Sequence, residues 1–115
     1  MGHGVDERRA AGPLDAAAAE AVARTLQALA TPSRLRILTH LRQGPSAVGD
    51  LAAAIGMEQS AVSHQLRLLR DLDLVSRTRA GRSTVYALFD HHVAMLLDEA
   101  VFHVEHRRLG LPDTP

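Results

Sequence analysis

The sequence predicts a small, mainly α-helical domain of the α+β class, with four helices, a β-hairpin and a fifth helix. Its 115 residues allow one domain. Hydrophobic residues make up 46% of the chain but aromatic residues only 3%, so leucine and alanine, which favour helices, must form most of the core. Apolar positions recur at helical spacing along most of the chain, whereas residues 84–89 form one run rich in β-favouring side chains.

The first two helices are predicted from their start and stop signals. Residues 1–14 contain three glycines and no periodicity, which is typical of a flexible arm. Asp15 can cap a first helix. Thr31 and Pro32, an N-cap followed by proline at the first helical position, start a second helix that Gly44 ends. We therefore expect three parts, namely an arm over residues 1–14, a domain over residues 15–109 and a short tail over residues 110–115.

The next two helices form a pair joined by a brief turn. A short third helix ends at a glycine suited to a left-handed cap, and a fourth follows over about residues 59–71. At 100° per residue, Val62, Leu66 and Leu69 of the fourth helix lie within an arc of roughly 60°. The opposite side carries polar and basic side chains, namely Ser60, Ser63, His64 and Arg67. One face of this helix is therefore predicted to pack on the core and the other to face outwards.

A β-hairpin with a basic tip is predicted after the fourth helix. Residues 84–89 are β-favouring, and the turn at Gly81 joins them to a preceding strand. Arg77 and Arg79 come before this turn, and Arg82 comes directly after it. The hairpin therefore presents three arginines around its tip.

The net charge is zero, with 13 basic residues against 13 acidic ones, but it is unevenly distributed. Residues 31–89 carry eight arginines and four acidic residues, a charge of +4, whereas residues 90–115 carry two arginines and five acidic residues, a charge of −3. Every cation is arginine, whose planar guanidinium suits phosphate and guanine, although a GC-rich genome would give the same bias. The basic middle of the chain is compatible with a nucleic-acid partner.

The short helix, turn, polar helix and basic hairpin together predict a winged helix-turn-helix that binds double-stranded DNA. Polar groups on the fourth helix can contact base edges, and the arginines can contact phosphates or the minor groove. Solvated surface residues are the alternative, but the polar face and the basic hairpin occur together. The predicted DNA contacts are Ser60, Ser63, His64, Gln65, Arg67, Arg77, Arg79 and Arg82. Because a domain of this size contacts only a few base pairs, we expect a homodimer formed by the first and last helices.

The last helix, which Asp90 can cap and which runs to about Arg108, carries a row of potential metal ligands. Asp90 and His92 lie near its start, and His103 and His106 lie near its end on nearly the same face. Eleven residues at about 1.5 Å rise separate His92 from His103 by roughly 16 Å, too far for one ion. If two such helices pack antiparallel in a dimer, Asp90 and His92 of one helix meet His103 and His106 of the other. A polar dimer seam is the alternative, but four potential ligands at complementary ends favour two metal sites.

The start of the chain offers two further nitrogen ligands. Removal of Met1 would expose the Gly2 amine beside the His3 imidazole. The four ligands of the last helix alone suit tetrahedral Zn(II), whereas six N and O ligands suit Ni(II) or Co(II). The alternative that His3 binds no metal fits the sequence equally well.

The absence of cysteine excludes disulfides, thiolate metal sites and thiol redox switches. No apolar run approaches the roughly 20 residues of a membrane span, and the N-terminus lacks the apolar core of a signal peptide. We therefore expect a cytoplasmic protein with no membrane partner. An enzyme is disfavoured, because the sequence has no glycine-rich phosphate loop and no convincing pair of nucleophile and base.

Three segments resemble the ArsR/SmtB family of winged-helix repressors, namely residues 29–38 (LATPSRLRIL), 59–70 (QSAVSHQLRLLR) and 79–86 (RAGRSTVY). The resemblance covers about residues 20–107. It implies a dimer that occupies a promoter and releases it when metal binds. The spacing of Asp90 to His92 and of His103 to His106 looks like the fifth-helix metal site of the zinc and nickel/cobalt branches of the family. The metal ligands that the resemblance implies are Gly2, His3, Asp90, His92, His103 and His106.

The expected function is a transcriptional repressor that leaves operator DNA when Ni(II) or Co(II) binds between the fifth helices of a homodimer. A Zn(II)-responsive repressor with a four-ligand site is the first alternative. A nickel or zinc buffer or chaperone is the second, and it would show no salt-dependent DNA binding. A repressor that responds to an organic effector, or to none, is the third, although we expect no small organic ligand.

Overall fold

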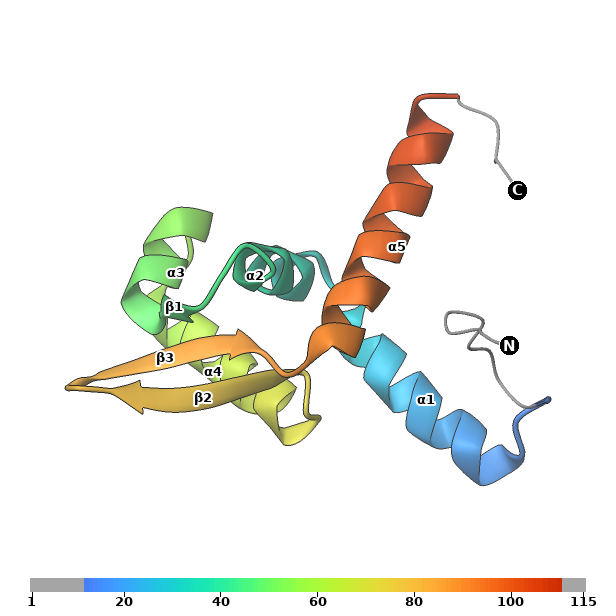
Figure 1. Ribbon diagram of the computed structural model, residues 1–115, viewed down its shortest axis with the longest axis horizontal. Coiled ribbons are helices and arrows are strands. Elements are labelled where there is room, and N and C mark those ends of the chain that lie inside the picture. Colours follow the sequence, from blue (N-terminus) through green and yellow to red (C-terminus); the bar gives the residue numbers. More distant parts are fainter. Residues whose placement is uncertain (1–11, 111–115) are drawn as a thin grey trace, which may run out of the picture.

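The computed structural model describes residues 12–110 and has the predicted order of four helices, a hairpin and a fifth helix, with one additional short strand (Figure 1). Within these residues, five helices accompany a three-stranded antiparallel sheet. The elements are α1 (Ala16–Leu29), α2 (Pro32–Leu41), β1 (Ser46–Ala47), α3 (Val48–Ile55), α4 (Gln59–Asp71), β2 (Val75–Ala80), β3 (Ser83–Leu88) and α5 (His91–Arg108). Most of the predicted arm, including Gly2 and His3, and most of the predicted tail lie outside the described residues.

Three helices begin, and one helix ends, at residues whose chemistry predicted these boundaries. Asp15 Oδ1 accepts a backbone N–H at 2.8 Å, Thr31 Oγ1 accepts one at 3.2 Å, and Asp90 Oδ1 accepts one at 3.1 Å. Gly56 ends α3 with a φ of 69°, the left-handed conformation that glycine adopts without strain. These local signals fix the starts of α1, α2 and α5 and the end of α3.

The sheet has the order β1-β3-β2, and β2 and β3 form the predicted hairpin. Its turn contains Gly81, whose φ is 62°. The strand β1 was not predicted. It has two residues, and Ser46 pairs with Tyr86 of β3, so it is too short to show any periodicity.

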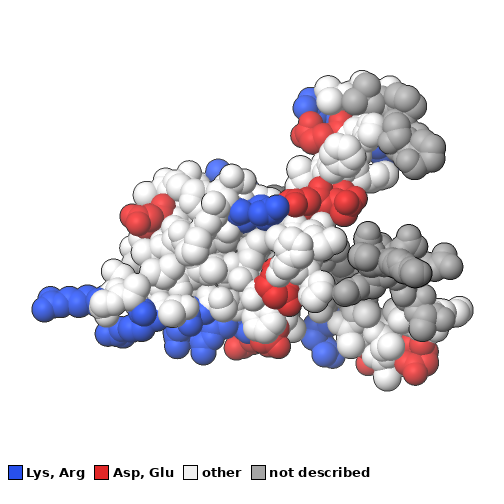
Figure 2. All heavy atoms as spheres, in the orientation of Figure 1, with Lys and Arg blue, Asp and Glu red and all other residues white. Residues whose placement is uncertain are grey.

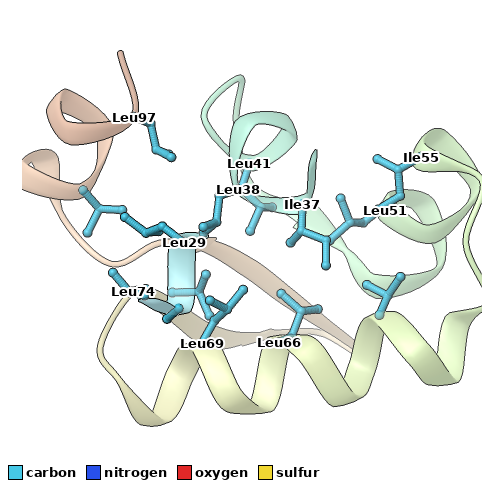
Figure 3. Close-up of a cluster of buried hydrophobic side chains, with 14 of the residues drawn as sticks. Leu29, Ile37, Leu38, Leu41, Leu51, Ile55, Leu66, Leu69, Leu74 and Leu97 are labelled. Atoms are coloured by element: carbon cyan, nitrogen blue, oxygen red, sulfur yellow. The ribbon is translucent and has the colours of Figure 1, made fainter. Parts of the chain in front are cut away.

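The core lies between α2, α3, α4 and the start of the hairpin (Figure 3). Val62, Leu66 and Leu69 are fully buried, which confirms the predicted core face of α4. Each buried leucine stabilises the fold by about 1.5–3 kcal/mol relative to an exposed one. The largest fully buried side chains are Ile37, Leu38, Leu51, Val62, Leu66, Leu69, Val75 and Leu97. Their packing fixes α4 against the body and leaves its other face to solvent.

Two helices stand out from this body, namely α1 and α5 (Figure 1). Only the end of α1 and the first half of α5 contribute buried side chains. The large exposed apolar residues on these two helices are Val22, Leu26, Met95, Leu96, Val101, Phe102 and Val104. A single chain therefore leaves an apolar face on α1 and α5 uncovered. Within residues 12–110, no helix is long and apolar enough to cross a membrane.

Candidate functional site

The outer face of α4 carries the side chains predicted to contact DNA. Ser60, His64 and Arg67 are exposed, and Ser63 is half-buried beside them. The buried face of α4 anchors the helix on the core, so these polar groups project from a rigid element. Hydroxyl, imidazole and guanidinium groups at this spacing can donate to and accept from base edges and phosphates.

Gln65 differs from the other predicted contacts on α4 because its side chain is bound within the protein. It is half-buried, and its Oε1 accepts a hydrogen bond from Nε of Arg34 on α2 at 2.7 Å. Nη1 of Arg34 also donates to the backbone oxygen of Ala28 at 3.5 Å. Sequence reasoning missed Arg34, because the pair joins positions 31 residues apart and no periodicity relates them.

The hairpin β2–β3 forms a wing beside α4. Arg77, Arg79 and Arg82 are all exposed. Arg77 and Arg79 lie two residues apart on β2 and so point to the same face of the strand, while Arg82 lies in the turn. Figure 2 shows the basic side chains gathered along the hairpin and the adjoining edge of the molecule. The wing therefore extends the polar face of α4 with positive charge.

The predicted metal ligands of α5 form two separate pairs. At the start of the helix, Nδ1 of His92 lies 3.4 Å from Oδ2 of Asp90. The backbone N–H of Val93 and, to a smaller extent, the His92 side chain lower the pKa of Asp90, so its carboxylate is charged at neutral pH. At the other end, His103 is exposed, and the ring of His106 meets Phe102 edge-on with centroids 5.1 Å apart.

The two pairs do not meet within one chain. In the described range 12–110, no three histidine or acidic side chains come together in a way that could hold a metal ion. This agrees with the helical separation of roughly 16 Å between His92 and His103. His91, which the helical angle turns away from both pairs, is exposed.

Comparison with known proteins identifies the family. The pattern described as "Bacterial regulatory protein, arsR family" matches residues 31–77, from α2 into β2. Over 114 residues the chain is 69% identical to HTH-type transcriptional regulator NmtR of Mycobacterium tuberculosis, which covers 98% of this chain and 95% of that protein. The chain belongs to the ArsR/SmtB family of transcriptional regulators. This confirms the predicted resemblance, and it agrees with the expectation that the protein is not an enzyme.

Solved structures of the ArsR/SmtB family share the fold. The solution structure of apo-NmtR has a TM-score of 0.74 at 68% identity and covers 99% of this chain and 97% of its own. A homodimeric winged helix-turn-helix DNA-binding domain from Mycobacterium bovis has a TM-score of 0.79 at 32% identity, with coverage of 92% and 100%. The predicted winged helix-turn-helix is thereby confirmed.

Proposed function

We propose that this ArsR/SmtB regulator binds operator DNA as a homodimer and is released when Ni(II) or Co(II) binds between the two α5 helices. In this proposal α4 enters the major groove, and the wing contacts phosphates or the minor groove. The proposed DNA contacts are Ser60, Ser63, His64, Gln65, Arg67, Arg77, Arg79 and Arg82. Metal binding selects a dimer geometry in which the two α4 helices no longer match successive grooves.

The uncovered apolar face supports the homodimer. Leu26 on α1 is 48% exposed, and Phe102 on α5 is 61% exposed. Large exposed apolar faces on a monomer mark interaction sites. A relative of the same fold from Mycobacterium bovis is a homodimer, which supports the same assembly here. A two-fold axis would also give the DNA two symmetric half-sites.

The division of the ligands between the two ends of α5 is the observation that carries the metal proposal. An antiparallel pair of α5 helices brings Asp90 and His92 of one protomer to His103 and His106 of its partner. The charged carboxylate of Asp90 and the imidazole nitrogens suit a borderline divalent ion. We include Gly2 and His3, which lie outside the described residues, because six N and O ligands favour Ni(II) or Co(II). The four α5 ligands without the arm would make a Zn(II)-responsive repressor instead.

The regulation is a coupling between two binding sites. Metal must bind the DNA-free geometry more tightly, and DNA must weaken metal binding by the same factor. A typical coupling of about 1–3 kcal/mol changes affinity roughly 5- to 150-fold. The absence of cysteine leaves histidine and carboxylate as the side chains that supply this response.

Fluorescence anisotropy with labelled promoter DNA tests the proposal. We expect saturating Ni(II) or Co(II) to weaken DNA binding roughly 5- to 150-fold. The double variant His103→Ala, His106→Ala should keep its metal-free DNA affinity and lose this response. His91→Ala, which removes an exposed imidazole outside both pairs, is the matched control. Unchanged affinity in Ni(II), Co(II) and Zn(II) would refute a metal sensor, and absence of salt-dependent DNA binding would favour a metal buffer.

A further inference from the structure

We propose that Arg34 is a positioning residue for DNA recognition, which fixes the side-chain amide of Gln65 so that its NH2 group, and not its oxygen, is presented to the duplex. This inference rests on the proposed function, because it assigns a role within DNA binding by α4. It depends on the hydrogen bond that joins the side chain of Arg34 on α2 to that of Gln65 on α4.

Chemistry fixes the direction of this hydrogen bond. Arginine has five N–H donors and no acceptor, so the atom of Gln65 that faces it must be the carbonyl oxygen. The distance from Nε to Oε1 is 2.7 Å, and both side chains are half-buried. Hydrogen bonds with one charged partner are about twice as strong as neutral ones. Rotation of the amide by 180° would bring donors face to face, so the bond selects one orientation of Gln65.

Arg34 is itself held in place by two neighbouring segments. Its backbone N–H is capped by Thr31 Oγ1 at 3.2 Å, and its Nη1 donates to the backbone oxygen of Ala28 at 3.5 Å. Ala28 belongs to the last turn of α1. Arg34 therefore links α1 and α2 to α4. Because α1 carries part of the uncovered apolar face, the orientation of Gln65 is tied to a helix of the proposed dimer interface.

The nitrogen at the other end of the Gln65 amide is not fully buried. In the part of the chain that the structure describes, no buried side-chain nitrogen or oxygen lacks a hydrogen-bond partner, and Nε2 of Gln65 has no protein partner there. The adjacent His64 is exposed on the same helix. The NH2 group therefore belongs to the polar surface of α4, while the oxygen belongs to the contact between helices.

This arrangement changes what Gln65 can recognise. A glutamine that is free to turn recognises adenine with both atoms, accepting from N6 and donating to N7. With its oxygen held by Arg34, Gln65 acts as a donor, which suits acceptors such as guanine N7 and O6, thymine O4 or a phosphate oxygen. We therefore expect Gln65 to contact a hydrogen-bond acceptor on the duplex and to give no preference for adenine over guanine.

A double-mutant cycle tests the role of Arg34. The probe is a duplex selected from a random-sequence pool by the wild-type protein, and the variants are Arg34→Met, Gln65→Leu and their combination. Each single variant should weaken binding about 5- to 150-fold, and the double variant should bind no more weakly than Gln65→Leu. Arg36→Met removes the same charge from an exposed position on α2 and is the matched control. Effects that multiply in the double variant would overturn the proposal, because Arg34 would then contact DNA itself.

Gln65→Glu tests which end of the amide faces the duplex. It keeps an oxygen for Arg34 but replaces the NH2 donor with a second acceptor, so we expect weaker DNA binding than for Gln65→Leu. Wild-type affinity of Gln65→Glu would overturn the proposal. Binding to single-base-pair variants of the duplex separates the two acceptor sources, since a base acceptor depends on the sequence at one position and a phosphate acceptor does not depend on the sequence.

A measurement without DNA separates the inference from the proposed function. In NMR spectra of the free protein, the Arg34 Nε–H should exchange slowly with solvent, and Gln65→Leu should remove this protection. The same measurement serves if Arg34→Met does not fold, because Gln65→Leu leaves Arg34 in place and removes only the oxygen that accepts its hydrogen bond. A wild-type protein that binds no duplex refutes the proposed function and this inference together. Wild-type binding combined with an unprotected Arg34 Nε–H refutes this inference alone.

Discussion

Arg42 and Asp98 join the end of α2 to the middle of α5 through two parallel hydrogen bonds, 2.9 Å from Nε to Oδ1 and 2.8 Å from Nη2 to Oδ2. The buried contacts of α5 come from Val93, Ala94 and Leu97 in its first half. The ion pair therefore attaches α5 to the end of α2 at a point just beyond the buried residues of the helix. Asp98 lies along α5 between the two pairs of proposed metal ligands, Asp90 with His92 and His103 with His106.

Removal of the Arg42–Asp98 ion pair should lower the Tm of the protein at neutral pH but not at strongly acidic pH. The Arg42 guanidinium lowers the pKa of Asp98 through its hydrogen bonds and then through its charge. Because the folded-state pKa lies below the unfolded value of about 3.9, the stabilisation is complete above that value and disappears as the pH falls through the folded pKa. Asp98→Asn should lower the Tm at pH 7, and the difference from wild type should shrink on acidification below about pH 4. Thermal unfolding followed by circular dichroism at several pH values measures this difference in Tm.

Arg42→Met provides the partner variant for this prediction. It should reproduce the pH-dependent Tm difference of Asp98→Asn, and the double variant should show no further decrease, because both substitutions break the same pair. A difference between wild type and Asp98→Asn that is the same at every pH would contradict the prediction.

The wing should contribute affinity without sequence preference. Arg79 and Arg82 are exposed near the tip of the hairpin, and binding to phosphates depends on salt through counterion release. Changing both to methionine should weaken binding to all duplexes alike and reduce the slope of log K against log salt by about 0.9 for each phosphate that the wing no longer neutralises. Arg24→Met, an exposed change on α1, is the control and should leave the slope unchanged. Weaker binding confined to particular base pairs would instead indicate that these arginines recognise bases.

Local chemistry made most of the fold predictable from the sequence. The sequence predicts helix starts at Asp15, Thr31 and Asp90, because an N-cap needs only one side chain and the first turn of the helix that follows it. The strand β1 escaped prediction because its two residues are defined only by pairing with β3. The hydrogen bond from Arg34 to Gln65 was not predicted for the same reason, since only the packed fold brings α2 next to α4. Sequence patterns thus predict what a single segment determines, and they miss what two distant segments determine together.

The apolar face of α1 and α5 should determine the oligomeric state. Phe102→Asp introduces a charge on this face, at a side chain that is 61% exposed in the single chain. If the face is buried between two copies, the unpaired charge disfavours the dimer. Light scattering should then report a mass of 12.4 kDa in place of twice that value. Ala54→Asp, at an exposed position on α3, should remain dimeric, and a dimeric Phe102→Asp would show that the interface lies elsewhere.

The ligand number of the metal site should depend on the free N-terminus. Gly2 can supply an amine nitrogen only when no residue precedes it. Co(II) bound to protein that begins at Gly2 should therefore give the weak visible absorption of a six-coordinate ion. The same protein with one extra residue in front should give the intense bands of a four-coordinate ion, since the four ligands of α5 are retained.

His3→Ala separates the role of the amine from that of the arm as a whole. It removes one of the two arm ligands and leaves the amine of Gly2 in place, so its Co(II) spectrum should also depart from the six-coordinate form. Identical spectra for all three proteins would exclude Gly2 and His3 from the site. The site would then consist of Asp90, His92, His103 and His106. Such a four-ligand set suits Zn(II), whereas the six-ligand set suits Ni(II) or Co(II), so the same experiment decides between these two kinds of effector.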